Sequence, residues 1–504
     1  MKKVLLIGVI TLLLSGCDIV IDFNTSNNFT SNKVSSSSKI TGSNQNKGLT
    51  GREYLDYYSE VVNCEYFPSI GSPTMLVVPV LFSDTNEDDM LKNKDAVITD
   101  LEKAFGGTSE DTGWESVTTY YKKSSYGKLD IQMDVYDEWI TLDKTFSEFA
   151  SLNEYLDPTW YVVDYVVEYL KKQGVDMTQY DSDRDGFVDG IWLVYGERSY
   201  VNIPNPTTKQ KDLLWAYTYW ETRNHPVIGN PKANAYCWGS YDFMYGVYDK
   251  ESPLTLQAHT FIHETGHILG LEDYYDYDGN SKLKPTGCLD MMDYNVGDHN
   301  AYTKYLLGWI EPQVFNFEEG QYTLNPFESS GDALLIPSKQ DNNISPLDEY
   351  LLIEYYTPTG LNELDSKYRL SAGHPLMFTQ KGIKIYHVDS RIGELVYDQG
   401  KWQYNGYVDN YSRSDLYLNS TGYSYFKTYA SNTSSISYNR DYKLVRLLSQ
   451  FYGNEYLYSG KYATNKDLFQ AGESLEYFEF NSGVELNFEI EVDYIGENSK
   501  LYIF

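Results

Sequence analysis

Short apolar runs separated by polar turns predict alternating strands and helices in the first half of the chain. Met75–Phe82 is an uninterrupted apolar run, rich in β-branched residues, that ends at a Ser-Asp turn, which is typical of a buried strand. Trp160–Lys172 carries apolar residues at helical spacing, and Gly190–Tyr195 is a second run of the buried-strand type. This strand, helix, strand order predicts a mixed α/β domain.

The pattern changes after about Pro312. Short alternating segments such as Tyr350–Tyr356 and Gly382–Val388 lie between turns rich in Asn, Gly and Ser, which favours an all-β module of the sandwich type. We therefore expect an α+β protein with a mixed-sheet domain at residues 51–315 and a β-rich domain at residues 316–504. A chain of 504 residues with 41% hydrophobic residues is ample for two packed domains.

The first residues are typical of an export signal. An apolar run from Val4 to Leu14 follows two lysines, and its length of about eleven residues is well short of the roughly twenty that span a bilayer. Leu14-Ser15-Gly16-Cys17 resembles the bacterial lipobox, so we expect residues 1–16 to be a lipoprotein signal peptide and Cys17 to be lipidated. The alternative is an ordinary secretory signal with an incidental cysteine.

The amino-acid composition indicates where the protein is located and which partners are excluded. Residues 17–50 are mostly Asn, Ser, Thr, Lys and Gly, which predicts a flexible stalk on the extracellular face of the cell membrane; whether the protein is shed stays open. The balance of 40 Lys+Arg against 72 Asp+Glu argues against a nucleic-acid partner, because phosphate binding needs clustered cations. Cys64, Cys237 and Cys288 fit no zinc ribbon, and we expect them to be thiols, with at most one disulfide.

Three of the seven histidines lie close together in the chain, at His259, His263 and His267. A helix places residues four apart on one face, so both imidazoles of His263-Glu264-x-x-His267 can bind one ion, and zinc suits this ligand pair. A catalytic zinc also needs a third protein ligand and an open position. We expect His259 to be structural. The alternative is a core helix whose histidines are only hydrogen-bonded.

The third ligand is expected just beyond this helix. Gly270 can adopt a left-handed conformation that ends the helix and turns Asp273 toward the metal. The complete pattern His-Glu-x-x-His-x-x-Gly-x-x-Asp resembles the extended metzincin signature, with Asp in place of its third His. Among zinc peptidases the alternative is a gluzincin, in which a distant Glu is the third ligand.

Further residues acquire roles from this motif. The metal of a zinc peptidase lowers the pKa of an attacking water, and Glu264 is expected to take its proton and pass it to the leaving amine. Cys288–Tyr294 resembles the metzincin Met-turn, with Met292 as the methionine beneath the zinc. Tyr294 is a candidate for stabilising the oxyanion, with ordinary packing as the alternative. His299 is expected to position its loop.

An acidic motif upstream predicts a second metal site. Oxygen ligands that alternate along a tight loop, with Gly at the turn, suit a cation of the size of calcium. Trp192 stands where a standard EF-hand has Glu, so the loop is closer to shorter calcium loops; a solvated acidic turn is the alternative. The expected calcium ligands are Asp181, Asp183, Asp185 and Asp189.

Several motifs in order along the chain resemble the immune inhibitor A family of bacterial secreted metallopeptidases, from about residue 70 to at least residue 390. Besides the zinc motif and the Asp-rich loop they are Leu76–Asp84, Ser116-Val-x-x-Tyr-Tyr121, Ser125–Lys128, Asp290-Met-Met292, Leu307-Gly-Trp309, Glu349–Glu354 and Tyr386–Asp389. The resemblance implies a metzincin-like zinc endopeptidase that acts on proteins or peptides and is stabilised by calcium. Many members carry a long propeptide, whereas only the stalk precedes this domain.

We therefore expect a surface-anchored, monomeric endopeptidase with a catalytic Zn²⁺ and a structural Ca²⁺. A noncatalytic surface binding protein or adhesin that keeps the peptidase fold is the alternative. An extended substrate is expected to pair with an exposed edge strand at Tyr236–Tyr245.

Overall fold

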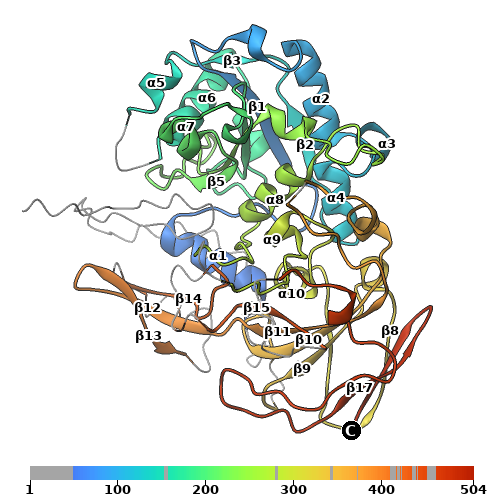
Figure 1. The fold of residues 1–504 in the computed structure, drawn as a ribbon. Coiled ribbons are helices and arrows are strands. Elements are labelled where there is room, and N and C mark those ends of the chain that lie inside the picture. Colours follow the sequence, from blue (N-terminus) through green and yellow to red (C-terminus); the bar gives the residue numbers. More distant parts are fainter. Residues whose placement is uncertain are drawn as a thin grey trace, which may run out of the picture.

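The computed structural model describes most of the chain from Leu49 onward (Figure 1). The described residues are 49–504 apart from 153–156, 279–281, 341–343, 372, 409–415, 417–419, 422, 434–438, 440 and 451–460. The predicted signal peptide, Cys17 and nearly all of the predicted stalk lie outside them. Within the described part of the chain, no helix has the length and apolar character needed to cross a membrane.

The first half contains a mixed sheet in the order β2-β1-β4-β6-β5. β1 pairs in parallel with β2, β3 and β4, and β4 pairs in parallel with β6, whereas β5 is antiparallel to β6. The strands predicted at Met75–Phe82 and Gly190–Tyr195 are confirmed as β1 and β4. The strands are β1 Thr74–Leu81, β2 Gln132–Val135, β3 Ile140–Thr141, β4 Ile191–Tyr195, β5 Tyr217–Trp220 and β6 Ala235–Ser240.

Helices cover both faces of this sheet. Along β4, Trp192 and Val194 enter the main core beneath α2, α4 and α8, whereas Leu193 enters a second core beneath α6, which confirms the helix predicted at Trp160–Lys172. Burial on both faces explains why β1 and β4 are apolar runs without alternation. The helices are α1 Gly51–Val62, α2 Lys94–Gly106, α3 Ser109–Thr112, α4 Val117–Ser124, α5 Phe146–Phe149, α6 Thr159–Gln173, α7 Thr208–Leu213, α8 His259–Ile268, α9 Met291–Tyr294, α10 Ala301–Leu306, α11 Phe327–Ser330 and α12 Glu363–Lys367.

The C-terminal half contains three further sheets. A five-stranded sheet has the order β15-β11-β10-β9-β7, a three-stranded sheet β13-β12-β14, and a four-stranded sheet β16-β17-β18-β8. Apart from β7, which runs parallel to β9, the pairings in these sheets are antiparallel. The strands are β7 Gln313–Val314, β8 Gly320–Leu324, β9 Ala333–Pro337, β10 Glu349–Tyr356, β11 Gly382–Asp389, β12 Ile392–Asp398, β13 Lys401–Tyr407, β14 Ser424–Thr428, β15 Val445–Leu448, β16 Ser474–Leu475, β17 Ile490–Ile495 and β18 Ser499–Ile503.

The five-stranded sheet is buried on both faces. On β10, Leu351 and Ile353 pack with Val492 of β17 in a C-terminal core, while Leu352 belongs to the main core together with Phe261 of α8. The main core therefore continues across residue 315, where the sequence predicts a domain boundary. Figure 1 shows the same continuity, because α1 lies beside the C-terminal strands although it precedes the first sheet in the sequence.

Candidate metal centre

Helix α8 carries the predicted zinc motif and ends where the sequence predicts. Gly270 has a positive φ of 99°, its N–H donates to the carbonyl of His267 (2.9 Å), and the N–H of Leu271 donates to the carbonyl of Gly266 (3.2 Å). These two bonds form a Schellman motif, which satisfies the last carbonyls of a helix and reverses the chain. The turn brings the segment that contains Asp273 back toward the histidines.

Three side chains converge on one point. Oδ1 of Asp273 lies 3.0 Å from Nε2 of His263 and 3.4 Å from Nε2 of His267. Potential ligand atoms of these three residues all lie within 4.8 Å of one another, and the three side chains are buried. The predicted ligand set His263, His267 and Asp273 is thus brought together in space, and the three can hold a metal ion.

Backbone carbonyls fix the orientation of both imidazoles. Nδ1 of His263 lies 2.7 Å from the carbonyl of Met291, and Nδ1 of His267 lies 2.8 Å from the carbonyl of Leu271. A carbonyl only accepts hydrogen bonds, so each Nδ1 carries a proton and donates it. This arrangement directs Nε2 of both rings toward the metal position, which is how metal-binding histidines are usually held.

The donor atoms fit a divalent cation. Nε2 of His267 and Oδ1 of Asp273 are buried and make no well-formed hydrogen bond. Burial disfavours the charged imidazole of His267, but the Asp273 carboxylate outweighs it and raises the pKa of His267 to about 9. Burial also opposes ionisation of Asp273, yet the two histidines hold its pKa well below the usual range. The centre thus stabilises positive charge, and two nitrogens with one carboxylate suit tetrahedral zinc with one open position.

Glu264 lies beside the triad and is held by the edge strand of the sheet. The hydroxyl of Thr218 in β5 donates to the Glu264 carbonyl (2.9 Å) and lies 3.3 Å from Oε2 of its carboxylate. Burial raises the pKa of Glu264, which favours a carboxylate that can take up a proton. Thr218 belongs to no motif, so no pattern in the sequence marks it.

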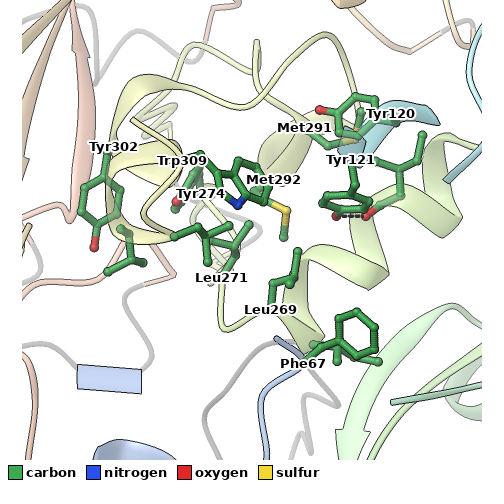
Figure 2. Close-up of a cluster of buried hydrophobic side chains, with 14 of the residues drawn as sticks. Phe67, Tyr120, Tyr121, Leu269, Leu271, Tyr274, Met291, Met292, Tyr302 and Trp309 are labelled. Carbon is green, nitrogen blue, oxygen red and sulfur yellow. Dashed lines mark hydrogen bonds between the residues drawn. The ribbon is translucent and has the colours of Figure 1, made fainter. Parts of the chain in front are cut away.

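Met292 packs directly beneath the histidine helix, as the Met-turn interpretation predicts. A side chain at Gly266, which lies between the two histidines, would place its Cβ 2.6 Å from the Met292 sulfur. Glycine at this position is therefore required for close approach. Figure 2 shows Met292 among the buried side chains around it, including Tyr121, whose hydroxyl donates to the carbonyl of Ile262 in α8 (2.6 Å).

Tyr294 lies in an aromatic group. Its ring packs 5.5 Å from that of His374 and 5.7 Å from that of Tyr462, with Nζ of Lys284 5.6 Å from the ring centre. Burial raises the pKa of its hydroxyl. The Tyr294 side chain also shares a hydrogen bond with Cys288. Its oxyanion role stays a prediction.

The other two histidines near the motif are buried. Nε2 of His259 lies 3.3 Å from the carboxylate of Asp365, and its ring stacks on Trp114 at 4.2 Å. His299 packs against Tyr121 and Trp309, and burial holds its pKa well below the usual range. Neither residue is in the group of three that converges on the metal position.

The Asp-rich loop forms a second acidic group. Carboxylate oxygens of Asp181, Asp183 and Asp189 lie within 4.8 Å of one another, and Oδ1 of Asp181 is buried without a hydrogen-bond partner. The fourth predicted ligand, Asp185, is not in this group and shares a hydrogen bond with Glu65. Burial and then the charge of Asp185 raise the pKa of Glu65 to about 8. Such crowding of negative charge favours a bound cation, and Glu65, which no motif marks, extends the loop.

Two remaining predictions concern the cysteines and the substrate strand. Cys64, Cys237 and Cys288 are buried thiols, as the sequence predicts. The prediction of an edge strand at Tyr236–Tyr245 is wrong, because β6 lies between β4 and β5 and is buried along its whole length. The apolar sequence of a strand does not indicate which other strands will pair with it. The edge beside Glu264 is β5.

Comparison of the chain with protein-family models and with curated protein sequences finds no match. The resemblance to the immune inhibitor A family therefore stays a prediction that depends on the motifs. The class of site is defined by its geometry: two imidazole nitrogens and a carboxylate oxygen that converge beside a buried glutamate.

Proposed function

We propose that the protein is a zinc-dependent endopeptidase. One observation carries the proposal: Nε2 of His263 and His267 and Oδ1 of Asp273 converge on one point, with Glu264 on the same helix. A purely structural role for the two histidines would not require an adjacent buried carboxylate held by Thr218. The arrangement supports a hydrolysis in which Glu264 accepts and donates the proton.

Each residue of the centre has a distinct task in this reaction. His263, His267 and Asp273 would hold the metal, and zinc there would supply a Lewis acid and lower the pKa of an attacking water. Glu264 accepts the proton of that water and then donates it to the leaving amine. His263 and Glu264 keep 5% and 4% of their surface exposed, whereas His267 and Asp273 have none, so substrate approaches from the side of His263 and Glu264.

The edge strand β5 is the favoured docking position for an extended peptide. It pairs with β6 on one side, and in the described part of the chain no strand pairs with its other side. An unpaired edge offers backbone donors and acceptors to an extended chain regardless of its side chains. Thr218 links this strand to Glu264, so a peptide bound there would lie close to the general base.

The finer assignments belong to the same proposal. We infer a metzincin-like domain followed by a sandwich-like C-terminal region, and a calcium ion held by the Asp-rich loop. Export as a lipoprotein, with Cys17 as the anchor, is consistent with a substrate among extracellular proteins or peptides.

Cleavage of fluorescent casein by the purified protein tests the proposal. Wild type should release fluorescent peptides, a zinc chelator should abolish this release, and re-addition of Zn²⁺ should restore it. Glu264→Gln should reduce activity ~100- to 10,000-fold, the usual contribution of a general base, while zinc affinity changes little. Wild type that is folded and zinc-loaded but inactive on casein and on peptide libraries would favour the noncatalytic binding protein.

A further inference from the structure

The loop that carries the third ligand is held from two directions. This ligand loop, residues 271–277, follows α8 and contains Asp273. Within the N-terminal half, the N–H of Tyr274 donates to the carbonyl of Met292 (2.7 Å), and the Tyr274 hydroxyl lies 2.7 Å from Oγ1 of Thr303. Further polar contacts of the ligand loop come from the C-terminal half.

Those contacts come from the end of β14 and the chain that leads to β15, which we call the clamp segment (described residues 427–433 and 443–445). They involve buried or nearly buried charges and backbone groups, and they are spread along the ligand loop. They are Lys427 to Glu272 (3.5 Å), Ser431 Oγ to Glu272 (3.1 Å), Asn432 Nδ2 to the Tyr274 carbonyl (3.1 Å), the Tyr277 N–H to the Thr433 carbonyl (3.2 Å) and Lys443 to Asp276 (3.8 Å).

Asn432 is the centre of the clamp segment. Its side chain is completely buried, and Nδ2 donates both to the Tyr274 carbonyl and to the Val445 carbonyl (2.8 Å). Its Oδ1 accepts the N–H of Val445 (3.1 Å). One amide thus joins the ligand loop to the first residue of β15. A buried network whose members are all satisfied is rigid, and the loss of one member leaves its partners unpaired.

Tyr277 transmits this restraint to the ligand itself. Its hydroxyl donates to Oδ2 of Asp273 (2.6 Å), whereas Oδ1 is the oxygen that faces the two histidines. The hydrogen bond therefore decides which carboxylate oxygen is offered to the metal. Since the backbone of Tyr277 is bonded to Thr433, the orientation of Asp273 depends on the C-terminal half.

We propose that Asn432 and Tyr277 are positioning residues for Asp273, so that the clamp segment sets the affinity of the centre for zinc. The inference rests on the proposed zinc function and adds to it: the C-terminal half completes the metal site. Residues that orient metal ligands typically contribute ~10- to 100-fold to metal affinity.

Zinc affinity of the full-length protein, measured by competition with a chromophoric chelator, tests the proposal. Asn432→Ala and Tyr277→Phe should each weaken zinc binding ~10- to 100-fold. The matched control is Asn362→Ala, which removes another buried amide of the C-terminal half, bonded to the Thr357 carbonyl and the Asp298 N–H. This control should lose thermal stability without a change in zinc affinity.

The visible spectrum of the Co²⁺-loaded protein gives a second readout, because its absorption reports the geometry of the ligands and not the stability of the fold. The spectrum should change in Tyr277→Phe and Asn432→Ala and stay unchanged in Asn362→Ala. If Asn432→Ala does not fold, the result for Tyr277→Phe alone tests the positioning role. This variant removes a single oxygen atom and is therefore expected to fold.

Wild-type zinc affinity and an unchanged Co²⁺ spectrum in Tyr277→Phe and in folded Asn432→Ala would overturn the positioning role while leaving the zinc centre intact. Failure of the wild type to bind zinc, or equal zinc binding by wild type and His263→Ala, would instead overturn the proposed function, and the inference with it.

Discussion

At the scale of single residues, the candidate centre is defined by the atom that each side chain leaves for a metal. Nδ1 of both histidines is occupied by a backbone carbonyl, and Oδ2 of Asp273 by the hydroxyl of Tyr277. The remaining atoms, Nε2 twice and Oδ1, point toward one another. Hydrogen bonds around the site therefore leave these three atoms available to a metal ion.

Removal of Asp273 should distinguish a metzincin-like site, in which Asp273 is the third ligand, from a gluzincin site. Asp273→Ala should weaken zinc binding at least ~100-fold, the upper end of what loss of an orienting partner causes. Equilibrium dialysis or chelator competition measures this. Asp157→Ala is the control, since it removes another buried carboxylate, bonded to the Thr159 N–H away from the centre. Near-normal zinc affinity in Asp273→Ala would favour a gluzincin with a distant glutamate.

Asp293 in α9 should make stability depend on pH. Burial, opposed by Thr286 and Lys284 and assisted by Asp290, raises the pKa of Asp293 to about 7. In the unfolded chain the pKa is about 4, so between about pH 4 and 7 the folded state binds a proton that the unfolded state has released, and stability falls as the pH rises.

Asp293→Asn should remove this loss, because Asn resembles the protonated acid. The variant should differ little from wild type in urea unfolding at pH 4, where the loss has only begun, and exceed it at pH 8 by roughly 2–4 kcal/mol, since each pKa unit corresponds to about 1.4 kcal/mol. The exposed Asp137→Asn serves as the control. Equal pH profiles for Asp293→Asn and wild type would contradict the prediction.

At the scale of elements, two short turns set the positions of the acidic side chains. The Schellman turn after α8 aims Asp273 at the histidines, and the Asp-rich loop before β4 gathers its carboxylates over a few residues. Both turns depend on glycines with positive φ, Gly270 and Gly186. The geometry of each site is therefore built into the local backbone.

Gly270→Ala should destabilise the protein more than the same change at another helix end. Ala at a φ of 99° is strained, and its Cβ would lie 2.7 Å from a methyl carbon of the buried Leu55, so we expect a loss of about 1–3 kcal/mol. Gly174→Ala, at a φ of 88° with no neighbour within 4 Å, isolates the backbone cost alone. Zinc affinity should fall only in Gly270→Ala. Equal losses of unfolding free energy in both variants, measured by urea unfolding, would contradict a cost from the contact with Leu55.

Calcium should stabilise the wild type through the Asp-rich loop. A ligand that binds only the folded state at about 100 times its Kd adds about 2.7 kcal/mol, which calorimetry detects as a rise in Tm. Asp181→Asn and Asp183→Asn should lose most of this rise, because they remove charge from the group of three carboxylates. An undiminished rise in both variants would locate the calcium elsewhere.

At the scale of the whole molecule, the two halves share one core. Phe261 of α8, Met292 of α9 and Leu352 of β10 belong to the same cluster of buried residues. The contacts of the clamp segment with the ligand loop run across the same interface. The C-terminal half is therefore part of the structure that supports the candidate metal centre.

A fragment of residues 51–315 should not fold as the intact chain does. The fragment lacks Leu335, Leu352 and Val388, which cover part of the main core in the intact chain. The apolar surface beneath them would be exposed, so we expect aggregation or loss of the cooperative thermal transition. Calorimetry and size-exclusion chromatography measure both. A soluble fragment that unfolds cooperatively and binds zinc as tightly as the full chain would establish residues 51–315 as an independent domain.

The sequence by itself determined the local parts of this protein. Two histidines four residues apart on a helix, a glycine that ends it and an aspartate three residues later are encoded within eleven positions, so short-range geometry was enough to predict that these side chains meet. Strands β1 and β4 and helix α6 followed from their apolar patterns for the same reason.

Only the tertiary structure decided which distant segments meet. The order of the strands placed β5 and not β6 at the edge of the sheet. Tertiary packing brought Thr218 to Glu264, Glu65 to the Asp-rich loop, and Asn432 to the ligand loop. These partners are separated by tens to hundreds of residues, and each is an ordinary polar side chain whose role arises from burial beside a partner. Periodicity and spacing report on neighbours along the chain, whereas these contacts are set by how the sheets and the shared core pack.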